Sequence, residues 1–199
     1  MKLLIKEGYS STNLYNKVML LEKAAVSNMA YGMAWVKQHA IDACLIGGTA
    51  VVNYLHGGRN LTPDVDYLVS NMNDVRNKLT SDGIQFSPIK DNNGGGLGIT
   101  VPKFNIDFLD PNSGNKFLNQ VILRSKINTN IGGATVSIIR PELLAIMKLE
   151  LGRQKDLDDA FALLQSGQLD KQTYIKFVEG LRGKLSDYES IRSYAELIK

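Results

Sequence analysis

The sequence is poor in the residues that define disulfide-rich and zinc-binding proteins. It has one cysteine (Cys44) and two histidines (His39 and His56) among 199 residues. A single cysteine excludes a disulfide within the chain and fits a reducing cytoplasm. Neither histidine has neighbours at zinc-ligand spacing. No segment approaches the ~20 apolar residues of a membrane-spanning helix, so we expect a cytoplasmic protein without a membrane partner.

An excess of one charge sign is also lacking. The chain has 23 basic and 20 acidic residues, which gives a net charge of +3. This small excess neither requires nor excludes a nucleic-acid partner. The length suits one compact domain, or a catalytic domain with a small helical addition.

Hydrophobic periodicity predicts a mixed fold with a helical last third. Strands are expected at 41–46, 65–69, 84–89, 97–101, 104–109 and 134–139. Helices are expected over 11–38, 49–55, 71–79, 141–151, 156–164, 171–182 and 187–198. The fold class is therefore α/β of the α+β kind, a small mixed sheet flanked by helices. Residues 1–140 are expected to form the sheet-containing domain, and residues 141–199 a helical subdomain.

Proline and glycine mark several predicted boundaries. Pro141 suits the first position of a helix, and Gly152 suits its end. The glycine-rich loop at 91–96 separates two expected strands and is interpreted as a hairpin tip, with a flexible lid as the alternative.

Two carboxylates stand at the start of the strand predicted at 65–69. Asp64 and Asp66 are two apart, so their side chains project from the same face of a strand, about 6.6 Å apart along it. Neighbouring carboxylates repel each other, which opposes ionisation of both. A bound dication removes that conflict, and Mg²⁺ prefers hard oxygen ligands. The pair therefore predicts a metal site with room for two Mg²⁺ ions, or Mn²⁺ in their place.

A third carboxylate, Asp107, stands between apolar residues of another expected strand. Burial of an acid is costly without a compensating charge. If this strand neighbours the strand of Asp66, their separation is only ~4.8 Å. Asp107 then completes the predicted metal site.

The predicted phosphate site centres on Gly47-Gly48, between a strand and a helix. Residues without side chains let a triphosphate approach the backbone, and amides at a helix start attract anions. Thr49 adds a hydroxyl, and Arg59 and Thr62 either contact phosphate or hold the loop before the acids. Taken singly, a glycine pair is more often a turn, and an Asp-x-Asp pair is more often a solvated strand end. The conjunction of all these elements is far more specific.

The stretch from Gly47 to Asp66, followed by Asp107, resembles the signature of the DNA-polymerase-beta-like nucleotidyltransferase superfamily. The resemblance implies a nucleotidyltransferase fold in which Asp64, Asp66 and Asp107 bind metal and are catalytic. Asp107 would also help to activate the attacking hydroxyl. Gly47 and Gly48 would hold the triphosphate of an NTP substrate. Arg59 departs from the pattern, since it stands five residues before Asp64 where many relatives have four.

The C-terminal third narrows the resemblance. Lys148, then Arg153, Lys155 and Asp156, is similar to a pattern in AbiEii-type toxin nucleotidyltransferases and related minimal proteins. This implies that these four residues contribute to nucleotide binding, with Lys148 on a phosphate and Asp156 at the edge of the site. Alternatively, Asp156 caps the helix that follows it.

The leading hypothesis is therefore transfer of an NMP from an NTP to a hydroxyl of RNA, such as tRNA, or of a protein. A toxin-like role in a toxin–antitoxin or phage-defence system would make a cognate antitoxin a candidate partner. Two alternatives remain: an antibiotic-modifying transferase that acts on a small alcohol, and a non-catalytic nucleotide-binding module. The presence of all three acids argues against the last.

Overall fold

The computed structural model describes residues 30–55, 64–90, 95–131 and 134–199. The described strands form one mixed sheet of seven, in the order β3-β4-β5-β2-β1-β7-β6. Their bounds are β1 Ala43–Ile46, β2 Val65–Val69, β3 Ser87–Lys90, β4 Gly96–Val101, β5 Ile106–Leu109, β6 Ile127–Ile131 and β7 Ala134–Ile138. This confirms the expected mixed α/β fold.

The centre of the sheet combines both pairing directions. β2 runs antiparallel to β1 and parallel to β5, and β1 also pairs in parallel with β7. β1 and β2 are almost wholly buried, since both are short apolar runs covered on two faces. Cys44 in β1 is fully buried, which makes it unreactive because burial raises the pKa of its thiol to about 12.

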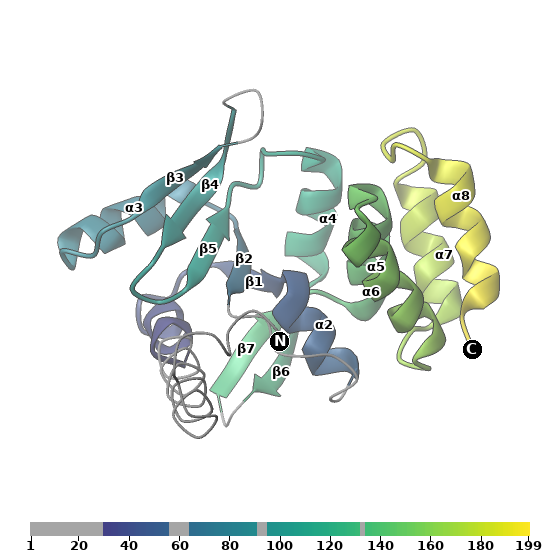
Figure 1. The fold of residues 1–199 in the computed structure, drawn as a ribbon, viewed down its shortest axis with the longest axis horizontal. Coiled ribbons are helices and arrows are strands. Elements are labelled where there is room, and N and C mark those ends of the chain that lie inside the picture. Colours follow the sequence, from purple (N-terminus) through teal and green to yellow (C-terminus); the bar gives the residue numbers. More distant parts are fainter. Residues whose placement is uncertain (1–29, 56–63, 91–94, 132–133) are drawn as a thin grey trace, which may run out of the picture.

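Helices cover the sheet, and several of them form a helical part of the molecule at one side of it. They are α2 Gly47–Leu55, α3 Met72–Ser81, α4 Lys116–Ser125, α5 Pro141–Leu151, α6 Gln154–Gln165, α7 Lys171–Gly180 and α8 Tyr188–Ser193, with a 3₁₀ turn at Tyr194–Leu197. Residues 30–38 are also helical. Figure 1 shows α4–α8 together on one side of the molecule and α3 on the other.

Local signals explain where several helices begin and end. Asn71, Asn115 and Asp170 cap α3, α4 and α7 by accepting hydrogen bonds from first-turn amides. Pro141 begins α5, and Gly152 ends it in the left-handed conformation with φ of 65°. These two boundaries match the sequence prediction.

The structure corrects several of the predicted elements, and it begins α2 and α6 two residues earlier than predicted. α4 and β6 were not expected, although Asn115 supplies a cap and Ile127, Thr129 and Ile131 alternate with asparagines. β3 begins at Ser87 rather than at 84, after the turn that follows α3. Phe104 lies in a turn before β5, because Asn105 takes a positive φ of 52°. Residues 11–29 of the first expected helix lie outside the described residues.

The C-terminal helices form a layer of their own, in which α5 and α6 pack against α2. α5 packs on α6, α7 and α2, and side chains such as Leu144, Leu163 and Tyr174 are fully buried there. The division at residue 140 stays a prediction. No described helix combines the length and the apolar content needed to cross a membrane.

Candidate functional site

Asp66 and Asp107 lie side by side on neighbouring strands. β2 and β5 pair in parallel, and in their register Asp66 is the partner of Asp107. Asp64 stands just before β2, two residues from Asp66. The two strands are therefore neighbours, which is the condition that the sequence analysis set for Asp107, and one end of the sheet carries all three acids.

The two glycines begin α2 directly after β1. Gly47 has a φ of 67°, and a Cβ placed on it would lie 1.9 Å from Oδ2 of Asp66. The Asp66 carboxylate therefore occupies the space that a side chain at residue 47 would need. Thr49 is buried, and its hydroxyl donates a hydrogen bond to the Asp64 carbonyl over 3.0 Å. Thr49 thus fixes the backbone that carries the acid pair.

The pKa of Asp66 is raised to about 6. Burial is the largest cause, followed by the negative charges of Asp107 and Asp64. The positive charges of Lys148 and Lys155 act in the opposite direction. The geometry therefore gathers negative charge at the end of the sheet and brings cations from α5 and α6 toward it.

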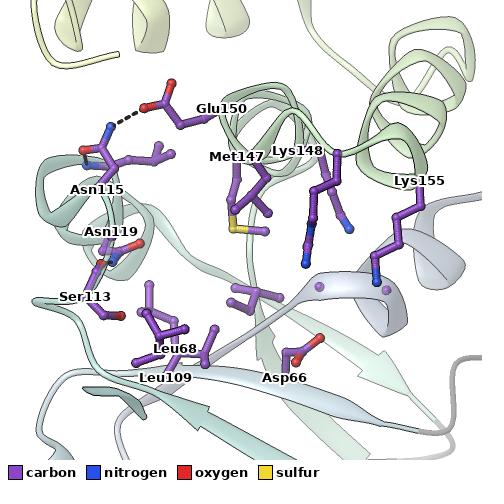
Figure 2. Close-up of a pocket in the computed structure, with 18 of the residues that line it drawn as sticks. Asp66, Leu68, Leu109, Ser113, Asn115, Asn119, Met147, Lys148, Glu150 and Lys155 are labelled. Carbon is purple, nitrogen blue, oxygen red and sulfur yellow. Dashed lines mark hydrogen bonds between the residues drawn. The ribbon is translucent and has the colours of Figure 1, made fainter. Parts of the chain in front are cut away.

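A cavity of about 450 Å³ opens between this end of the sheet and helices α4 to α6. One part of its wall is polar or charged and includes Gly47, Gly48, Asp64, Asp66, Lys148, Arg153 and Lys155. Figure 2 shows the Lys155 side chain reaching from the α6 side toward the strand end that carries Asp66. The volume falls in the range of small-molecule sites.

Lys148 lines this cavity but is held by two carboxylates. It is 4% exposed, and its Nζ lies 2.6 Å from Oδ1 of Asp156 and 3.0 Å from Oδ2 of Asp159. Arg153 Nε also donates to Asp156. Burial opposes ionisation of Asp156, but the hydrogen bonds from Lys148 and Arg153 outweigh it and lower the pKa of that carboxyl. Lys148 is thus a buried cation that joins α5 to α6.

The alternative role suggested for Asp156 is wrong. Arg153 occupies the N-cap position of α6 and makes no side-chain capping bond. Asp156 is fully buried and accepts hydrogen bonds from Lys148 and Arg153 instead. In contrast, Lys155 is exposed, and the Arg153 side chain is 60% exposed. These two residues present positive charge to solvent at the cavity.

The fit of a metal ion rests on the chemistry of the donors. Carboxylate oxygens suit Mg²⁺ and Mn²⁺, and a cation here would remove the repulsion that raises the pKa of Asp66. Asp64 and Asp66 line the cavity, whereas Asp107 is not part of its wall. Among the described residues, no three acid, histidine or cysteine side chains already surround one point as metal ligands. The acid pair fits a cation, and the part of Asp107 in holding it stays a prediction.

Sequence reasoning missed the other half of the cavity. Its wall is largely apolar, from Leu68, Leu97, Leu109, Leu118, Met147 and Leu151. Ser113, Asn115, Asn119 and Glu150 add polar groups at this side, and Figure 2 shows the bond from Asn115 to Glu150. The helical spacing of Leu118, Val121 and Ile122 after the Asn115 cap was the available signal for α4. Arg59 and Thr62 lie outside the described residues.

Comparisons with known proteins bear on the fold alone. No protein-family model and no curated protein matches the chain. An antigenic nucleotidyltransferase-like protein from Paracoccidioides brasiliensis matches with a TM-score of 0.50 and 16% identity, over 88% of this chain and 93% of that one. The antibiotic-resistance factor ANT(2'')-Ia matches with a TM-score of 0.50 and 11% identity, over 91% of this chain and 98% of its own.

The Megavirus polyadenylate synthase matches with a TM-score of 0.45 and 14% identity, over 90% of this chain and 45% of that one. The first two likenesses, at near-complete coverage of both chains, show that the molecule has the nucleotidyltransferase fold.

Proposed function

Starting from the nucleotidyltransferase fold, we propose that this chain transfers an NMP from an NTP to a hydroxyl group, with release of pyrophosphate. One observation carries the proposal: a single cavity is lined by Gly47 and Gly48, by Asp64 and Asp66, and by the cations of α5 and α6. Phosphoryl-type transfer depends on positioning and charge stabilisation, with little covalent work for the protein. At one end of the sheet the cavity has glycines that can position a phosphate, and charged side chains that can stabilise the transition state.

In this proposal the exposed cations bind the triphosphate. Lys155 and Arg153 reach the cavity from the start of α6, while the glycines let phosphate approach the backbone of α2. Lys148 lies on the same wall, where Asp156 and Asp159 hold its amine in place. Arg59 and Thr62 are further candidate phosphate contacts.

The acids supply the negative part of the site. Asp64 and Asp66, with Asp107, would hold one or two Mg²⁺ ions, which when bound would neutralise charge on the phosphates. The acceptor oxygen attacks the α-phosphorus, and the bond from that phosphorus to the pyrophosphate oxygen breaks. The acceptor proton passes to a carboxylate, and the family resemblance implies Asp107 as the base; it lies beside Asp66 in the sheet, although it is not part of the cavity wall.

The test is transfer of label from each of the four α-labelled NTPs, with Mg²⁺ or Mn²⁺ and total RNA or cell lysate. We expect label on an acceptor with wild-type protein and its loss with Asp66→Asn. The matched control is Asp158→Asn, an exposed acid on α6 that bonds Gln154 and does not line the cavity. Calorimetry that finds no NTP binding with either metal would refute the proposal, and binding without transfer would favour a non-catalytic nucleotide-binding module.

Within this function we propose a toxin-like role of the AbiEii kind, with a cognate antitoxin as partner. The support is the order of Lys148, Arg153, Lys155 and Asp156, which the structure gathers at one junction of α5 and α6. Induced expression in bacterial cells should arrest growth, and Asp66→Asn should abolish the arrest. Normal growth with active protein would refute the toxin-like role alone.

A small hydroxylated antibiotic is the second candidate acceptor. The likeness to ANT(2'')-Ia and the large apolar part of the cavity wall favour it. The same labelled NTPs with a panel of hydroxyl-bearing antibiotics in place of RNA would test it. Transfer to an antibiotic, and none to RNA or protein, would replace the leading proposal for the acceptor.

A further inference from the structure

An exposed aromatic side chain stands between two lysines at the beginning of α4. Phe117 is 42% exposed. The Nζ of Lys184 lies 4.4 Å from the centre of its ring, and the Nζ of Lys116 lies 5.4 Å from it. Both lysines are exposed and come from different elements, since Lys184 lies in the loop between α7 and α8. We call Lys116, Phe117 and Lys184 the Phe117 patch.

The Phe117 patch borders the cavity. Asn115, which lines the cavity, donates from Nδ2 to the Lys184 carbonyl over 2.7 Å and to Glu150 over 2.9 Å. Glu150 in turn accepts hydrogen bonds from the amide and hydroxyl of Ser186. These bonds fix the α7–α8 loop against the cavity rim, and Figure 1 shows that loop at the same end of the molecule as the beginning of α4.

Apolar exposure gathers at the same rim. Among the described residues, the exposed large apolar side chains are Tyr31, Phe117, Leu151 and Leu197. Leu151, at 49% exposure, lines the cavity, and Phe117 lies beside its rim. Two of these four exposed apolar side chains, Leu151 and Phe117, therefore lie at or beside one opening.

The chemistry of the patch identifies the kind of ligand it suits. An aromatic face offers a stacking surface for an unpaired base, and the lysine ammonium groups that lie over the ring can move from it to neutralise backbone phosphates. The nearby acid, Glu150, is engaged by Asn115 and Ser186, which limits its repulsion of phosphate. A duplex hides its base faces, so the combination selects a single strand.

We propose that the Phe117 patch binds the acceptor of the reaction as a single-stranded RNA, with a base on Phe117 and phosphates on Lys116 and Lys184. This inference rests on the proposed nucleotidyl transfer and assigns its acceptor. The strand enters the cavity past Asn115 and Leu151, and its terminal hydroxyl is directed toward the wall that carries Asp66. The Phe117 patch positions the acceptor and takes no part in the chemical step.

Binding of a fluorescent single-stranded RNA oligonucleotide to the full chain, without NTP, tests the patch by anisotropy. Phe117→Ala should weaken binding about 5- to 150-fold, which is the usual effect of losing one base stack. Phe117→Trp should retain it. Lys184→Gln and Lys116→Gln should each reduce the slope of log affinity against log salt by about 0.7, whereas Phe117→Ala should leave the slope unchanged.

Two matched controls isolate the site. Leu197→Ala removes an exposed apolar side chain elsewhere, and Lys176→Gln removes an exposed lysine of α7. Both should bind RNA as wild type does. The Phe117→Ala protein should also keep wild-type NTP binding by calorimetry, because Phe117 lies outside the cavity wall. Thermal unfolding should show that this variant is still folded.

The results separate this inference from the proposed function. If NTP binding is intact but none of the substitutions at Phe117, Lys116 and Lys184 changes RNA affinity, the proposed role of the Phe117 patch is wrong and the proposed function is unaffected. Equal affinity for single-stranded and duplex RNA would have the same meaning. If label is transferred to a protein, and Phe117→Ala does not change the rate of that transfer, the Phe117 patch is also wrong and the acceptor is a protein. If the wild type binds RNA through Phe117 but binds no NTP, the patch stands and the transfer reaction fails.

Discussion

The Asp66 carboxylate fills the space beside Gly47 that any other residue would need for its side chain. A Cβ on Gly47 would lie 1.9 Å from Asp66 Oδ2 and 2.7 Å from its Cγ. β1 and β2 are paired so that Ile46, next to Gly47, faces Asp66 across the ladder. The requirement for glycine therefore comes from the acid as much as from the turn.

Gly47→Ala should damage both stability and nucleotide binding. A positive φ costs a non-glycine residue about 1–2 kcal/mol, and the overlap with Asp66 displaces the carboxylate in addition. Gly167→Ala is the matched control, since Gly167 has a φ of 74° and a Cβ placed on it would meet no atom within 4 Å. Thermal unfolding and NTP calorimetry should show a larger stability loss for Gly47→Ala, and lost binding in that variant only. Equal effects of the two substitutions would contradict this account.

Asp66→Asn should stabilise the nucleotide-free protein in a pH-dependent way. The pKa of Asp66 is about 6 in the folded protein against 3.8 for an ordinary aspartate, so its ionisation opposes folding as pH rises through this window. One pKa unit corresponds to about 1.4 kcal/mol, so we expect a gain of about 2–3 kcal/mol above pH ~6. The gain should vanish below pH ~4, where the acid is protonated in both states. Urea unfolding across this range measures it, and a pH-independent gain would point to packing instead of charge.

Lys148→Ala and Lys155→Ala should differ sharply. Loss of Lys148 removes the cation that Asp156 and Asp159 share, with only Arg153 still bonded to Asp156, and breaking a buried ion pair costs about 3–5 kcal/mol. Lys155 is exposed, so Lys155→Ala should leave the free energy of unfolding unchanged. The same substitution should weaken NTP binding, because Lys155 lines the cavity. Chemical denaturation and calorimetry on both variants check this. If Lys148→Ala keeps wild-type stability and loses only NTP binding, its role is that of a phosphate contact and the structural role is wrong.

Asp64→Asn, Asp66→Asn and Asp107→Asn should each reduce transfer strongly, since each removes one negative group from the proposed metal site. Loss of one preorganised stabilising group typically costs about 10²–10³ in rate. Chelation of divalent cations should abolish transfer by wild-type protein, and Mg²⁺ or Mn²⁺ should restore it. Wild-type activity of Asp107→Asn would exclude Asp107, and Asp110, which caps the turn after β5, would be the next acid to test.

The parts of the fold that the sequence predicts well are those with strong local signals. β1 and β2 are short apolar runs between turn residues, and Pro141 with Gly152 delimits α5. Glycines and paired carboxylates mark the ends of these elements, and they are the signal on which the prediction of the acids depends. α4 and β6 carry weaker signals, since α4 is half polar and β6 has asparagine at alternate positions.

The role of Lys148 depends on tertiary geometry that local patterns lack. Lys148 lies in α5, whereas Asp156 and Asp159 lie in α6, after the helix break at Gly152. The angle between the two helices therefore decides whether these charges come into contact. The same holds for the Phe117 patch, because Lys184 reaches Phe117 only through packing of the α7–α8 loop on Asn115.

The parallel pairing of β1 with β7 has a consequence for synthesis on the ribosome. β1 and β2 leave the ribosome early and can pair with each other at once. The other edge of β1 stays unpaired until residue 138 of β7 has been synthesised. Non-local pairing of this kind slows folding, and an unpaired edge invites association with other chains. Lys148 and Lys155 follow later still, so a nascent chain that already carries Asp66 has neither its compensating cations nor an enclosed cavity. The proposed reaction at the acids would therefore require translation to pass α6.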